Sequence, residues 1–192
     1  MSSFLNKIKA GVKLAPASLI VLYLLFFILD SVTTYIASPD LKYESNWLVV
    51  LLNLDWLGII IKDTLIFTVV SASLILSLNF LNDYSIRNLF NGYKDLVLKS
   101  FKDPKLLISI IFIGMFFSHI LNLGHIILNN YLAYVFLHQT NGWIKSFATY
   151  YISNQKYFLF YIQYLLIIPG YIIAIYRVRL INKRIFQNNP RS

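Results

Sequence analysis

Four long apolar runs constrain this chain more than any other feature of its sequence. They cover about residues 16–37, 56–80, 104–128 and 157–177, and each is close to the roughly 20 residues that an α-helix needs to cross a bilayer. Only 13% of the residues are charged, against about 25% in soluble domains. The sequence therefore predicts an all-α, polytopic integral membrane protein whose four transmembrane helices form a bundle.

The polar segments predict how the chain is divided. We expect a single membrane domain at 14–180, with a loop at 82–103 that carries an amphipathic helix along the membrane surface, and a basic tail at 181–192. Residues 1–13 place apolar side chains at helical spacing between lysines, which fits an interfacial amphipathic segment or a frayed tail.

Two further apolar patches are too short to span a membrane. They are residues 47–54 and 131–137, and the sequence leaves open whether each is re-entrant or interfacial. Asp55 is the expected cap of the second long helix. Asp103 followed by Pro104 is a strong signal for the start of the third.

The basic residues predict the orientation. With four spans, both termini and the polar stretch 82–105 lie on one side, where 13 basic residues gather, whereas the other side holds only Lys42, Lys145 and Lys156. Cytoplasmic segments carry an excess of lysine and arginine. We therefore expect an integral membrane protein with both termini in the cytoplasm, facing anionic headgroups there. The net charge of +9 is explained by lipid, so nucleic acid is not an expected partner.

The most informative functional feature is a layer of polar residues within the apolar runs. Counting about 1.5 Å per residue, each helix contributes a polar group at a similar depth in the outer half of the membrane. Such groups are costly in lipid and are candidates for function. The predicted cluster consists of Asp30, Thr33, Thr34, Glu44, Asn46, Lys62, Asp63, His119, Asn122, His125 and Gln163.

Several members of this cluster have alternative explanations. The long side chain of Lys62 could reach the outer headgroups, and His119 and His125 could be neutral groups that hydrogen-bond between helices. Asp30 is too short to reach the headgroups, so it is either protonated or paired. We expect an ion pair between Asp30 and Lys62, with Thr34 donating a hydrogen bond to the same carboxylate.

Part of this layer resembles a known but uncharacterised family. The stretch from Asp30 to Thr34, followed by Glu44-Ser-Asn46 and then Lys62, is similar to a pattern found in small prokaryotic polytopic membrane proteins. The family pattern is Asp, Thr four residues later, Glu-x-Asn-Pro and a membrane lysine, and Trp47 stands here in place of that proline. The resemblance implies that Asp30, Thr34, Glu44, Asn46 and Lys62 belong together. It also implies an integral protein of a prokaryotic plasma membrane, and it supplies no reaction.

Signals for particular chemistry are absent from the sequence. There is no cysteine, which excludes thiolate sites, and no HExxH, Gly-x-Ser-x-Gly or phosphate-binding glycine loop. His119 and His125 do not share a helix face, so we predict no metal site and no cofactor. Asp30 and Asp63 could lie close together within the membrane and form an acid pair, that is, two neighbouring carboxyl groups.

The function we expect is non-enzymatic. An outer polar pocket would bind a small ligand or ion, or would pack against a partner helix. Two alternatives stay open. One is a membrane-embedded enzyme that uses Asp30, Glu44 and His119 on a lipid-linked or small polar substrate. The other is a proton-coupled transporter subunit, for which four helices would have to assemble into a homo-oligomer or with another membrane partner.

Overall fold

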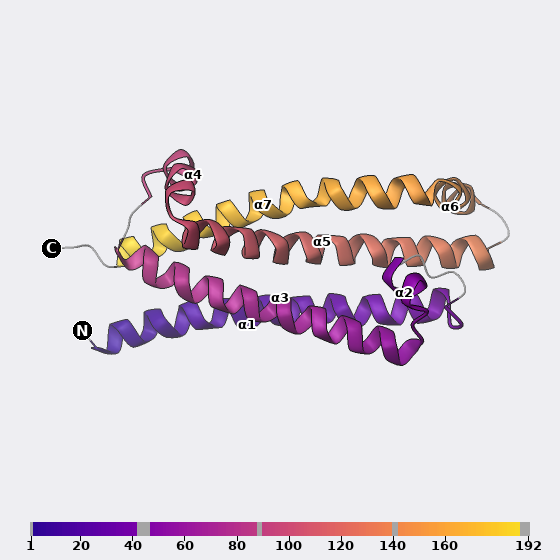
Figure 1. The fold of residues 1–192 in the computed structure, drawn as a ribbon, viewed down its shortest axis with the longest axis horizontal. Coiled ribbons are helices and arrows are strands. Elements are labelled where there is room, and N and C mark those ends of the chain that lie inside the picture. The colour runs from indigo at the N-terminus through magenta and orange to yellow at the C-terminus, as the bar shows by residue number, and fades with distance from the viewer. Residues whose placement is uncertain (1, 42–46, 88–89, 140–141, 189–192) are drawn as a thin grey trace. The chain divides into compact units, whose positions relative to one another are not determined.

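The protein is all-α in the computed structural model, which describes every residue except 1, 42–46, 88–89, 140–141 and 189–192. The described residues form seven helices and no strand (Figure 1). These helices are α1 (Ser2–Ala37), α2 (Trp47–Leu52), α3 (Trp56–Arg87), α4 (Tyr93–Lys102), α5 (Pro104–His138), α6 (Trp143–Ser153) and α7 (Gln155–Asn188).

Four of these helices contain segments long and apolar enough to cross a membrane, as the sequence predicts. The segments are Ala17–Ala37, Trp56–Leu81, Pro104–His138 and Tyr164–Arg184. Large apolar side chains along them are exposed, for example Val21, Leu76 and Ile172 at 57%, 69% and 62%. Side chains of this kind are stable in lipid and costly in water. The fold is therefore consistent with a membrane-embedded protein.

Both predicted helix starts are confirmed by their capping bonds. The backbone N–H of Gly58 donates to Asp55 Oδ1 over 2.8 Å at the start of α3. At the start of α5, the N–H groups of Lys105 and Leu106 donate to Asp103 Oδ1 over 3.0 and 3.3 Å. Each carboxylate satisfies N–H groups that have no partner within the first turn of a helix.

Several helices are longer than expected. α1 runs without a break from Ser2, so the segment 1–13 continues into the first long helix. α5 continues to His138 and includes 131–137, which is thus neither re-entrant nor a separate interfacial piece. Asn129 and Asn130 do not end α5, because the Asn130 amide bonds to α1 instead of competing for nearby backbone groups.

The segment after α5 forms a helix that the sequence did not reveal. Ala148 and Tyr151 of α6 pack on Leu132 and Val135 of α5 in one buried apolar cluster. Tertiary packing of this kind stabilises a helix too short to be stable alone.

α7 follows at once from Gln155 and continues through Pro169. The loop at 82–103 contains α4, as expected.

The chain divides into two compact units. Unit 1 comprises Met1–Leu22, Val69–His119 and Ile167–Ser192, and unit 2 comprises Tyr23–Thr68 and Ile120–Leu166. We describe each unit by itself. In unit 1, α5 and α7 approach closely where the Ser118 hydroxyl donates to the carbonyl of Ile167 over 3.3 Å. Most of the predicted polar layer belongs to unit 2.

Candidate intramembrane polar site

An aromatic layer in unit 2 fixes how α1 and α3 meet. Tyr23 stacks on Phe67 with ring centroids 4.8 Å apart, and Phe27 lies 5.7 Å from the same ring. Farther along, Tyr35 meets Trp56 edge-on at 5.5 Å. Residue numbers rise along α1 while they fall along α3, so the two helices are antiparallel at this interface.

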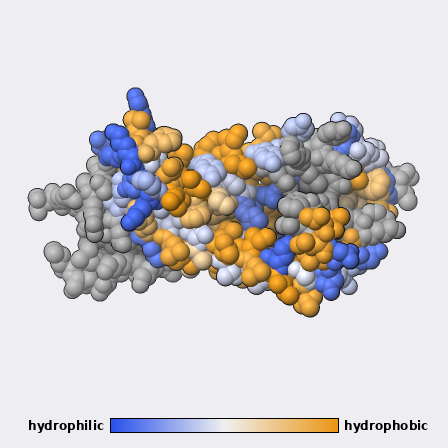
Figure 2. Space-filling view, viewed as in Figure 1, coloured by the Kyte–Doolittle hydropathy of each residue, from blue (hydrophilic) through white to orange (hydrophobic). Residues whose placement is uncertain are grey.

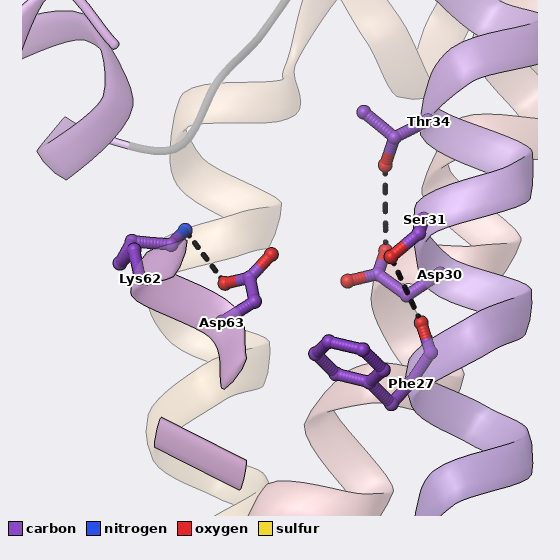
Figure 3. Close-up of polar contacts among 6 residues, drawn as sticks. All are labelled: Phe27, Asp30, Ser31, Thr34, Lys62 and Asp63. Carbon is purple, nitrogen blue, oxygen red and sulfur yellow. Dashed lines mark hydrogen bonds and ion pairs between the residues drawn. The ribbon is translucent and has the colours of Figure 1, made fainter. Parts of the chain in front are cut away.

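This register brings Asp30 and Asp63 to the same level. Asp30 lies one turn beyond Phe27, and Asp63 lies one turn before Phe67, on the helix faces that carry the aromatic contacts. Figure 3 shows both carboxylates directed toward one another from α1 and α3. Both side chains are only partly exposed. The acid pair that the sequence left as conceivable is thus supported by the geometry.

Lys62 has a different partner from the expected one. Its Nζ lies 2.9 Å from Asp63 Oδ1, and the two side chains are only 16% and 21% exposed (Figure 3). Among the described residues no ion pair joins Lys62 to Asp30. The flexible side chain of Lys62 bends toward its sequence neighbour Asp63, whose carboxylate is nearer than the Asp30 carboxylate on α1. The predicted Asp30–Lys62 pair is therefore replaced by a pair within α3.

Asp30 instead belongs to a network of neutral donors. Its Oδ1 accepts hydrogen bonds from Thr34 Oγ1 at 3.5 Å and from Asn130 Nδ2 at 3.4 Å. The same Asn130 nitrogen lies 3.1 Å from Thr33 Oγ1 and 2.8 Å from Thr34 Oγ1. The predicted Thr34 bond is confirmed. The amide of Asn130 joins α5 to α1 at the level of the carboxylate.

A second polar group lies farther along α5. His125 Nε2 is 2.8 Å from the hydroxyl of Tyr151 on α6. Burial raises the pKa of this tyrosine above its usual value. Asn122 lies one turn from His125, and within the described part of unit 2 neither Asn122 Oδ1 nor His125 Nδ1 has a hydrogen-bond partner, although both atoms are buried.

The remaining predicted residues lie either outside the described residues or in the other unit. Glu44 and Asn46 lie outside the described residues, as does the side chain of Gln163. His119 is in unit 1, whereas Asp30, Asp63 and Asn130 are in unit 2. Among the residues described, no group of three or more histidines and acidic residues is arranged to hold a metal ion.

The sequence reasoning missed Asn130 and Tyr151. Asn130 carried a signal, because an asparagine in an apolar run is costly unless it finds a partner, but it lies just beyond the run 104–128 that was predicted to form the third helix. Tyr151 carried none, since it is one of 14 tyrosines in the chain.

No protein-family model, curated protein or solved structure matches this chain.

Proposed function

We propose that this chain is a multi-pass membrane protein that binds a small hard cation between α1 and α3, at the carboxylates of Asp30 and Asp63. The observation that carries the proposal is that these two carboxylates point toward one another (Figure 3). Two like charges in a site of low dielectric disfavour one another. A cation between them relieves this repulsion, and oxygen ligands are those that hard cations prefer.

The surrounding residues support a site rather than a chance encounter of side chains. Thr34 and Asn130 hold the Asp30 carboxylate by hydrogen bonds, which fixes its position before a ligand arrives. Lys62 compensates part of the negative charge of Asp63. With two acidic groups and one basic group, the three side chains together favour a monovalent cation over a divalent ion.

Stability in the presence of ions tests the proposal. We expect a monovalent cation to raise the unfolding temperature of the purified protein, because a ligand at 100 times its Kd stabilises by about 2.7 kcal/mol. Asp30→Asn and Asp63→Asn should each abolish the rise. Asp95→Asn, an aspartate on α4 in unit 1, is the matched control and should keep it. An equal rise in all four proteins, or in none, would refute a cation site here.

The proposed orientation places this site in the outer half of a prokaryotic cell membrane, with both termini in the cytoplasm. The excess of basic residues on one side supports it. Because the chain has no cysteine, single cysteines at positions 94 and 145 give a clean labelling test. Position 145 should react from outside, and position 94 only after permeabilisation. The reverse pattern would invert the orientation without affecting the cation test.

We propose a binding protein rather than an enzyme, because the facing carboxylates of Asp30 and Asp63 supply oxygen ligands for a cation (Figure 3). The enzyme alternative uses Asp30, Glu44 and His119, of which Glu44 lies outside the described residues. The acid pair would equally serve a transporter, since a carboxylate that gains and loses a proton is a common device in membrane transport.

A further inference from the structure

We propose that the outward side of α4 binds the anionic headgroup layer of the membrane. α4 belongs to unit 1, so this inference is independent of the cation site in unit 2. It rests on how α4 is attached, on which of its charges are used internally, and on which side chains remain outside.

Buried contacts attach the start of α4 to α7. The backbone N–H of Phe90 donates to Asn182 Oδ1 over 3.0 Å, and both residues are fully buried. Tyr84 of α3 stacks on the Phe90 ring at 5.8 Å. A fixed attachment point of this kind also fixes which side of α4 faces away from unit 1.

One charged pair of α4 is used internally. Lys99 Nζ lies 3.0 Å from Asp95 Oδ2 and 5.6 Å from the centre of the Phe90 ring. Asp95 Oδ2 also accepts a hydrogen bond from the backbone N–H of Asn91 over 3.0 Å. Asp95 is the only acidic residue of α4, so its negative charge is balanced within the unit.

The outward side combines apolar and basic side chains. Leu98 and Phe101 are 52% and 73% exposed, and Lys94 is exposed between them. At 100° per residue these three lie within about 60° of one another around the helix. Tyr93 and Lys102 flank them and are also exposed. This mixture is typical of helices that insert their apolar side chains just below the headgroups while lysines bind lipid phosphates.

The orientation of the α4 axis also fits binding to the headgroup layer. Figure 1 shows α4 lying across the direction of α5 and α7 within unit 1. If α5 and α7 cross a bilayer, α4 lies in its plane. Figure 2 shows hydrophilic and hydrophobic side chains side by side over α4. Because the exposed charges are positive, an anionic surface is favoured, and each lysine near it strengthens the attraction roughly fivefold.

A spin label at position 101 tests this contact in reconstituted vesicles. In phosphatidylcholine with added phosphatidylglycerol, we expect the label to collide with oxygen, which dissolves in lipid, more than with a water-soluble nickel complex. In phosphatidylcholine alone, or in high salt, the nickel complex should gain access. The double variant Lys94→Gln/Lys102→Gln should lose the dependence on lipid charge, whereas Lys94→Arg/Lys102→Arg, which keeps both charges, should retain it.

Two results would overturn the proposal. A label that contacts water equally in neutral and anionic vesicles would show that α4 does not bind the membrane surface. A label shielded from both oxygen and nickel would show instead that protein covers this side, as in contact with a second copy of the chain. Circular dichroism of each variant checks that α-helical content is unchanged, so that a lost contact is not a lost fold.

Discussion

The side-chain nitrogen of Asn130 lies 2.8 Å from the hydroxyl oxygen of Thr34 and so joins α5 to α1 within unit 2. The same nitrogen also approaches Thr33 and the Asp30 carboxylate. Hydrogen bonds between membrane helices contribute on average about 0.6 kcal/mol each, and about 1.7 kcal/mol at most. This one amide therefore supports both the helix interface and the position of the carboxylate.

Asn130→Leu should lower the free energy of unfolding by about 1 kcal/mol. The substitution keeps a side chain of similar size but removes the donor shared by Thr33, Thr34 and Asp30. Unfolding in mixed detergent micelles measures the change. An unchanged free energy of unfolding would mean that the hydroxyls of α1 satisfy one another without α5.

Asn122→Leu, on the same helix, should leave the stability unchanged or raise it. Within the described residues Asn122 Oδ1 is buried without a hydrogen-bond partner, and a buried unsatisfied polar group costs about 1–3 kcal/mol. Replacing it with an apolar side chain of similar size removes that cost. The same unfolding assay serves, and a clear loss of stability would indicate that Asn122 has a bound partner such as water.

Gly170→Ala should destabilise unit 1 by about 1–3 kcal/mol through overpacking. A Cβ at this position of α7 would lie 2.6 Å from the backbone nitrogen of Ser118 on α5, and backbone cannot move aside as a flexible side chain can. Gly92→Ala is the control, because nothing lies within 4 Å of its added Cβ. Similar thermal unfolding of the two variants would show that α5 and α7 can separate without cost.

Acid should loosen the start of α4. The backbone N–H of Asn91 and then the side chain of Lys99 hold the pKa of Asp95 below its usual value. A depressed pKa means that the stabilisation is present above the pKa of the unfolded chain and is lost as the pH falls through the lower, folded value. The protection factors of residues 91–102, which compare measured exchange with the intrinsic rate at each pH, should therefore fall at acid pH. In Asp95→Asn they should be low already at neutral pH. Protection factors that stay the same at both pH values and in both proteins would contradict this role.

The sequence predicted the architecture well for physical reasons. Length and hydropathy alone define a membrane span, so all four spans were found, and the caps at Asp55 and Asp103 depend only on local chemistry. The C-terminal end of α5 and the presence of α6 were missed because they depend on tertiary contacts, namely Asn130 with α1 and Tyr151 with the cluster that contains Leu132 and Val135.

The site was predicted in part. Matching depths correctly suggested that Asp30 and Asp63 share a level, since depth follows from residue counts along straight helices. Depth says nothing about which way a side chain points around its helix or which rotamer it adopts. Lys62 was therefore assigned to Asp30, whereas the structure pairs it with Asp63.

A double-mutant cycle of Asp30→Asn and Asp63→Asn tests the central claim most directly. In buffer without the stabilising cation and at neutral pH, the two carboxylates should repel, and the coupling energy between them should be unfavourable, at about 0.5–3 kcal/mol for residues in contact. With saturating cation, the two should bind the same ion, and the coupling should become favourable. A coupling energy near zero under both conditions would contradict a shared cation site at Asp30 and Asp63.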